Sequence, residues 1–258
     1  MKRWLIGLFC VLLSGAALAA GPAAVRKRVQ ASMLLTGTIV VAPDGSVSQY
    51  AVDHREKLPP AVSGLLAKAV PAWRFAPVVV DGKPVIAKTT MSMRIVARPV
   101  SNDKYSIGVA GVIFNDGQDK TGESITWKNE VRPVYPRDAV DLGVSGTVYV
   151  LARVDRQGRV VEAIARQVDL GIIASDEQLA VWRRMLADAT MRAVKRSTFD
   201  PPTVGKSAAD PYWQVAFPVA FALAAGTASS YGQWQLYVPG PVQEAPWVDK
   251  RVLAGSAD

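Results

Sequence analysis

The sequence predicts an α+β fold made of two copies of one small module, each an antiparallel sheet packed on one main helix. Three observations carry this prediction. The order strand, Gly-containing turn, strand, helical stretch, Phe-containing segment and long strand occurs twice in 258 residues. The long strands alternate apolar and polar side chains, as in an antiparallel sheet with one covered face. Each helical stretch has apolar residues at helical spacing.

The two copies align on short matching segments. Residues 37–41 read Gly-Thr-Ile-Val-Val, and residues 146–150 read Gly-Thr-Val-Tyr-Val. A turn glycine follows in each copy, Gly45 or Gly158, and later a Phe-x-Pro step, Phe75 to Pro77 or Phe199 to Pro201. A degenerate repeat of this kind indicates two copies of one unit. The repeated positions hold no reactive side chain, which favours binding over catalysis.

The first module is assigned to residues 20–114. Strands are expected at 33–41 and 46–52, joined by the tight turn at Asp44 and Gly45. Pro59 and Pro60 can begin a helix, because proline is tolerated in the first helical turn, and Pro71 ends it. A long strand at 85–96 follows, with a further strand at 105–114.

Residues 115–130 are assigned as a linker, since 115–124 are polar and rich in glycine. The second module, residues 131–225, is expected to place strands at 147–154 and 159–168. A helix follows that Ser175 and Gln178 cap as a capping box. The last strand spans 213–223, where Pro218 cannot donate to a neighbour, so this strand should have a free edge. Residues 226–258 form a Pro-rich and aromatic tail without periodicity.

Residues 1–19 predict a cleavable signal peptide. Lys2 and Arg3 precede an apolar stretch, and Ala17 and Ala19 supply the small residues of a cleavage site. The apolar stretch of about 15 residues falls short of the roughly 20 that span a bilayer. We therefore expect an exported periplasmic protein. An uncleaved inner-membrane anchor is the alternative.

Cleavage removes Cys10, the single cysteine, and leaves a chain without disulfides or thiol chemistry. It also removes Lys2 and Arg3, which lowers the formal charge from +8 to +6. Export argues against nucleic acid as the partner of this basic chain. Attraction to an anionic membrane surface or to an acidic partner is one interpretation of the charge, and solubility alone is the other.

The second module resembles the TonB C-terminal domain over residues 131 to about 223. The resemblance rests on a Pro-x-Tyr-Pro opening, two Gly-x-Val steps and a Phe-x-Pro ending, which here are Pro133, Tyr135, Pro136, Gly146, Gly158, Phe199 and Pro201. The first module keeps Phe75 and Pro77 but lacks the opening, so it resembles a diverged second copy.

This resemblance implies a small periplasmic domain of a Gram-negative bacterium that grips a short segment of an outer-membrane transporter. A full TonB-type energy transducer also has an N-terminal membrane helix with a histidine and a long Pro-rich spacer. Neither feature is found in this sequence. The leading hypothesis is therefore a non-catalytic binding protein, and a membrane-anchored energy transducer is the alternative.

The partner is expected to bind as an added β-strand on the last strand of the second module. The residues assigned to this edge are Trp213, Gln214, Val215, Ala216, Phe217, Val219 and Phe221. Strand 85–96, which has no proline, is the alternative site. The aromatic tail with Trp234, Tyr237 and Trp247 is a candidate internal competitor that covers one of these two edges.

Other side chains are given structural roles first. Tyr135 is expected to pack in the fold, with a ligand contact as the alternative. A face of arginines is expected to be solvated, with docking to an acidic peptide or lipid as the alternative; its residues are Arg183, Arg184, Arg192 and Arg196. His54, the only histidine, lies in a polar stretch beside charged residues and is expected to be solvated, since a triad or metal site needs partners that converge on it. No metal, cofactor or catalytic residue is assigned.

Overall fold

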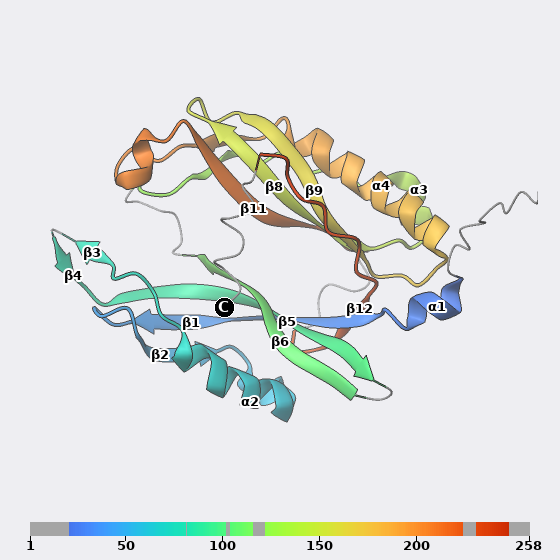
Figure 1. Ribbon diagram of the computed structural model, residues 1–258, viewed down its shortest axis with the longest axis horizontal. Helices are drawn as coiled ribbons and strands as arrows, with labels where there is room; N and C mark the ends of the chain where they lie inside the picture. The colour runs from blue at the N-terminus through green and yellow to red at the C-terminus, as the bar shows by residue number, and fades with distance from the viewer. Residues whose placement is uncertain (1–20, 81, 102–103, 116–121, 224–230, 248–258) are drawn as a thin grey trace, which may run out of the picture.

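The computed structural model describes residues 21–80, 82–101, 104–115, 122–223 and 231–247. Within these residues the fold is α+β, with mostly antiparallel sheets and four α-helices. Figure 1 shows two main sheets, one above the other, each with its long helix on the outer side. The predicted fold class is confirmed at this level.

The first sheet is built around β1 (Gln30–Val41) and β5 (Ala87–Ser101), which pair over their length. β2 (Val47–Val52) lies on the other side of β1, and β6 (Lys104–Asn115) on the other side of β5. Helix α2 (Pro60–Ala69) has Pro59 as its N-cap and runs into a short 3-10 turn at Val70–Ala72. The core between sheet and helix consists of Met33, Leu35, Ile39, Leu58, Val62, Leu66, Val70, Met91, Met93 and Ile95.

The second sheet has three strands, with β8 (Gly146–Asp155) between β9 (Val160–Leu170) and β11 (Tyr212–Phe221). Helix α4 (Asp176–Val194) packs on it and begins with the expected capping box of Ser175 and Gln178. Short helix α3 (Arg137–Asp141) precedes β8. The core of this sheet includes Val148, Val150, Ala152, Leu170, Leu179 and Leu186.

The two sheets share one local geometry at the turn that closes their first hairpin. Gly45 and Gly158 have φ angles of +81° and +76°, and their carbonyls accept from the backbone N–H groups of Phe75 and Phe199 at 2.9 and 2.8 Å. A Cβ on either glycine would lie about 2 Å from the phenylalanine carbonyl oxygen. In both sheets, therefore, the turn glycine contacts the distant Phe-x-Pro segment with which it recurs in the sequence.

The segment expected as a linker is partly structured. β7 (Thr126–Asn129) pairs with β10 (Thr198–Asp200), and Trp127 stacks on Phe199 with ring centroids 4.2 Å apart. Residues 116–121 lie outside the described residues. The second unit therefore begins before residue 131, because an aromatic ring upstream covers its core. The remaining small elements are β3 (Val79–Val80), β4 (Lys83–Pro84) and the 3-10 turns Arg55–Lys57 and Lys206–Ala209.

The terminal segments also differ from the expected boundaries. Helix α1 (Pro22–Arg26), assigned to the first module, buries Val25 completely in the core of the second sheet. From the tail, β12 (Gln235–Tyr237) pairs with Gln30 to Ser32 of β1, while Val238 joins the second core. The chain thus contributes to the second unit at both ends. Among the described helices, none is long and apolar enough to cross a membrane.

Candidate functional site

The last strand of the second sheet, β11, pairs with β8 on one side, and no described strand pairs with its other side. Its side chains alternate as expected. Trp213 and Phe221 are buried, Val215, Phe217 and Val219 are half-buried, and Gln214 and Ala216 are exposed. The apolar face is anchored where the Trp213 indole N–H donates to the Ser207 carbonyl at 3.0 Å and Phe217 meets the Trp127 ring. These contacts fix the inner face of β11 against the rest of the second unit.

Pro218 indicates which backbone groups of β11 face outward, away from β8. Proline occurs in edge strands where its missing N–H would face away from the neighbouring strand. Since successive residues of an antiparallel strand point their backbone groups to alternate sides, the outward side of Pro218 is shared by the N–H groups of Tyr212, Gln214, Ala216 and Ala220. The free edge thus offers four donors interrupted at one position.

The alternative edge on the first sheet does not exist. The strand expected at 85–96 is β5, which pairs with β1 on one side and with β6 on the other. Its backbone groups are therefore already used, and the alternative site is wrong. The same comparison shows that the position beside β5 is filled by β6, whereas the position beside β11 is open in the described part of the chain.

The described part of the tail pairs with two strands, and neither is one of the two considered from the sequence. β12 pairs with the start of β1, and Val238 and Leu170 exchange backbone hydrogen bonds of 2.8 and 3.1 Å. Further on, the Gln243 N–H donates to the Arg166 carbonyl at 2.7 Å. In the described residues 231–247, the tail thus reaches β9, at the side of the second sheet opposite to β11, and pairs with no part of β11.

Arg94 lies at the contact between the two sheets. Its guanidinium donates to the Asp169 carboxylate at 2.9 Å and lies 4.8 and 4.9 Å from the ring centroids of Tyr149 and Tyr237. Asp169 is buried and also accepts from Gln167 and from the Gly240 N–H. Arg94 comes from β5, Asp169 from β9 and Tyr237 from the tail, so one cation joins all three. Nothing in the sequence distinguishes Arg94 from other polar residues on an alternating strand.

The motif residues have structural roles. Tyr135 donates from its hydroxyl to the Val144 carbonyl at 2.8 Å and meets Phe221 edge to face, and burial raises its pKa. Pro136 is the N-cap of α3. Phe199 is 2% exposed, whereas Phe75 is half-buried in a cluster with Trp73 and Phe114. The packing role of Tyr135 is confirmed, and Phe75 lies at the margin of its core.

The arginine face of α4 is not uniformly solvated. Arg184, Arg192 and Arg196 are exposed. Arg183, in contrast, is half-buried and donates to the carbonyls of Val168, Val238 and Pro239. Burial lowers its pKa from the usual range of arginine. This side chain ties helix, sheet and tail together, and the expectation that it belongs to a solvated face is wrong.

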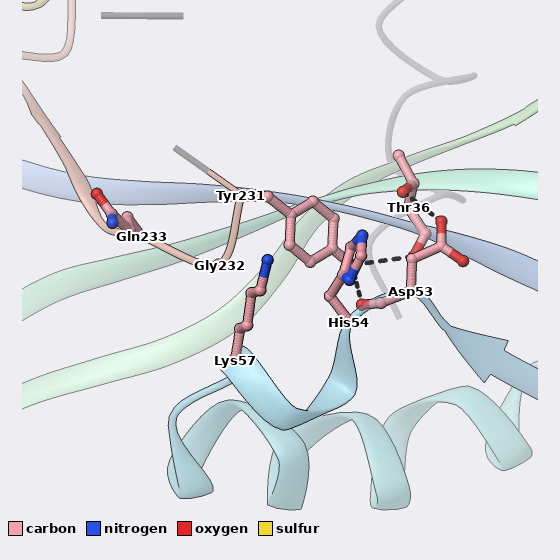
Figure 2. Close-up of a pocket in the computed structure, with 7 residues that line it drawn as sticks. All are labelled: Thr36, Asp53, His54, Lys57, Tyr231, Gly232 and Gln233. Atoms are coloured by element: carbon pink, nitrogen blue, oxygen red, sulfur yellow. Dashed lines mark hydrogen bonds between the residues drawn. The ribbon is translucent and has the colours of Figure 1, made fainter. Parts of the chain in front are cut away.

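A polar pocket of about 770 Å³ lies between β1, the turn at His54 and the tail. Figure 2 shows the residues that line it. His54 has a φ of +48°, is the one described non-glycine residue with positive φ, and meets the Tyr231 ring edge to face. The Asp53 carboxylate accepts from Thr36 at 2.6 Å, and His54 Nδ1 lies 3.5 Å from Glu56. The Thr36 hydroxyl is thus bound to a carboxylate, whereas the contacts of His54 are with Glu56 and Tyr231. Among the described residues no cluster of three or more His, Cys, Asp or Glu could hold a metal ion.

A scan against models of known protein families gives no match to this chain, and searches of curated proteins and of solved structures give none either.

Proposed function

We propose that this chain is an exported, non-catalytic binding protein made of two tandem TonB C-terminal-like units, in which β11 takes up an extended peptide by strand addition. The observation that carries the proposal is the outer edge of β11, beside which no strand of the described residues lies, at the position where the first sheet has β6. An open edge presents unpaired N–H and C=O groups, which an extended peptide can satisfy.

The edge also offers what selective peptide binding requires. Side chains of an added strand would lie beside the exposed Gln214 and Ala216 on one face and beside the half-buried Phe217 and Val219 on the other. Alternating side chains of the guest would therefore meet two different surfaces, which gives specificity in strand addition. No charged residue occurs between Tyr212 and Phe221, so the guest is expected to be neutral or apolar at its centre.

The resemblance to TonB domains supplies the class of partner, a peptide segment of an outer-membrane transporter or another envelope protein in the periplasm. The location depends on cleavage after Ala19. Mass spectrometry of the purified protein should find a mature N-terminus at Ala20. An intact Met1 or Lys2 in a membrane fraction would support an anchored energy transducer in place of a periplasmic binding protein.

Strand capture is tested by calorimetric titration of residues 20–258 with periplasmic segments of outer-membrane transporters as synthetic peptides. Ala216→Pro removes one outward donor, and Ala216→Ser is the matched control because it keeps the donor at the same exposed position. Loss of a hydrogen bond in the interface should weaken binding by about fivefold to tenfold. Pro218→Ala restores the missing donor and should strengthen binding.

The same peptides with one N-methylated backbone nitrogen at a time give an independent readout. Alternate positions should be sensitive, because only every second residue of an added strand faces β11. Equal effects of Ala216→Pro and Ala216→Ser, or sensitivity without alternation, would rule out capture at this edge. Binding of none of the peptides at millimolar concentration would rule out strand capture of such segments.

A further inference from the structure

A groove of about 820 Å³ lies at the end of the first sheet that is next to α1. Its walls come from the start of β1, the end of β5, the start of β6 and the tail strand β12, which lie together on the α1 side of Figure 1. This volume falls within the range of about 300–1,000 Å³ typical of small-molecule sites. The groove is separate from the β11 edge, which belongs to the other sheet.

Large apolar side chains converge on this groove although they are exposed. Val100, Tyr105 and Leu236 are 69%, 62% and 63% exposed, and Ile173 is 39% exposed. Half-buried Trp234 lies deeper in the wall. A folded chain places scattered apolar residues on its surface without consequence, but a group of them around one concavity indicates an apolar ligand.

The charged residues among the described lining of the groove have one sign. Arg26 and Lys27 line it and both are exposed, and no Asp or Glu lines it among the residues that the structure describes. Neighbouring Arg28 is bound to Asp176, but neither of these two residues lines the groove. An occupant with an apolar body and one anionic end would match both the wall and the rim.

We propose that this groove binds an anionic amphiphile with a single acyl chain, the chain against Val100, Tyr105 and Leu236 and the anionic head near Arg26 and Lys27. A peptide has polar backbone groups that this apolar wall leaves unpaired. An acyl chain has no polar backbone groups, and each methylene that it buries adds favourable binding free energy. The tail strand forms one wall through Leu236, so binding would also stabilise the contact between β12 and β1.

The experiment is a calorimetric titration of residues 20–258 with octanoate, decanoate and dodecanoate, and with 1-decanol as a neutral ligand of matched length. Affinity should rise about fourfold for each added methylene until the groove is full. Combined Arg26→Gln and Lys27→Gln substitutions should weaken decanoate binding by about tenfold and leave 1-decanol unchanged. Decyl phosphate in place of decanoate distinguishes a phospholipid head from a free carboxylate.

Leu236→Asp and Val100→Asp should each abolish decanoate binding, because either places a negative charge in the apolar wall beside an anionic ligand. Val134→Asp is the matched control, since Val134 is 84% exposed and lies outside the groove. Unchanged thermal unfolding of the variants would show that the fold is intact. Affinity independent of chain length, equal binding of decanoate and 1-decanol, or equal loss with Val134→Asp would each overturn the proposal.

Discussion

Replacing Arg94 by methionine should loosen the contact between the two sheets more than any comparable change on the surface. The substitution keeps an unbranched apolar side chain but leaves the buried Asp169 carboxylate without its cation. Breaking a buried pair from one side costs about 3–5 kcal/mol. The Arg94 side chain is 26% exposed, so we expect the lower end, about 3 kcal/mol. With an m-value of about 2 kcal/mol/M, the urea midpoint should fall by about 1.5 M.

The second sheet contains a matched control for this experiment. Arg153 pairs with Glu162 at 2.8 Å and lies 4.0 Å from the Tyr212 ring centroid, but both charged side chains are more exposed and belong to one sheet. Arg153→Met should therefore cost only about 1 kcal/mol. Adding Asp169→Asn should rescue part of the loss in Arg94→Met, because the buried charge is then gone. An Arg94→Met variant as stable as Arg153→Met would refute the role of Arg94 in joining the sheets.

Three further predictions concern the second unit. Phe199→Ala should cost about 3–5 kcal/mol in urea unfolding, since the ring is 2% exposed; a cost below about 0.5 kcal/mol would contradict its place in the core. A fragment of residues 131–225 lacks the buried Val25 and Val238 and should melt at a lower temperature than residues 122–247, which regain Val238 and Trp127; equal melting would refute this dependence. Burial raises the pKa of Asp155, but hydrogen bonds from the Arg159 backbone and side chain and from Gln157 outweigh it and leave a pKa below 3.8. Its stabilising contribution is therefore complete above the unfolded pKa and lost as the pH falls through the folded one, so Asp155→Asn should flatten the loss of stability below about pH 4.

The sequence predicted the elements whose signals are local. The alternation in β5 and the stripe of Val62 and Leu66 in α2, continued by Val70 just after the helix, correspond to buried faces. Ser175 and Gln178 form the expected capping box. These features depend on residues a few positions apart. The match between Gly158 and Phe199 was also visible, because the repeat presented the same pair of segments twice.

The contacts that sequence reasoning missed join distant segments without any periodic signal. Val25 and Val238 are single apolar residues in short segments, yet both are buried in the second core. β12 has three residues, too few for an alternation pattern to stand out. Within the candidate site, Pro218 predicted the free edge of β11. The pairing of β6 with β5 could not be predicted, because strand order in a sheet depends on contacts between segments far apart in the sequence.

Pro218 is consistent with two roles: it can be a gap in an edge that binds peptides, or it can protect the edge from pairing with other chains. The composition of β11 favours the first role. Proline and charged side chains are devices by which exposed edges avoid pairing with other chains. β11 has the proline but no charged residue between Tyr212 and Phe221, and Pro218 blocks only one of five outward positions. An edge protected against all pairing would be expected to carry more than one such device. A partner that skips one hydrogen bond can still use the other four. Pro218→Ala separates these roles: an increase in peptide affinity supports a binding edge, whereas self-association without a gain in peptide affinity would show that the proline protects the edge.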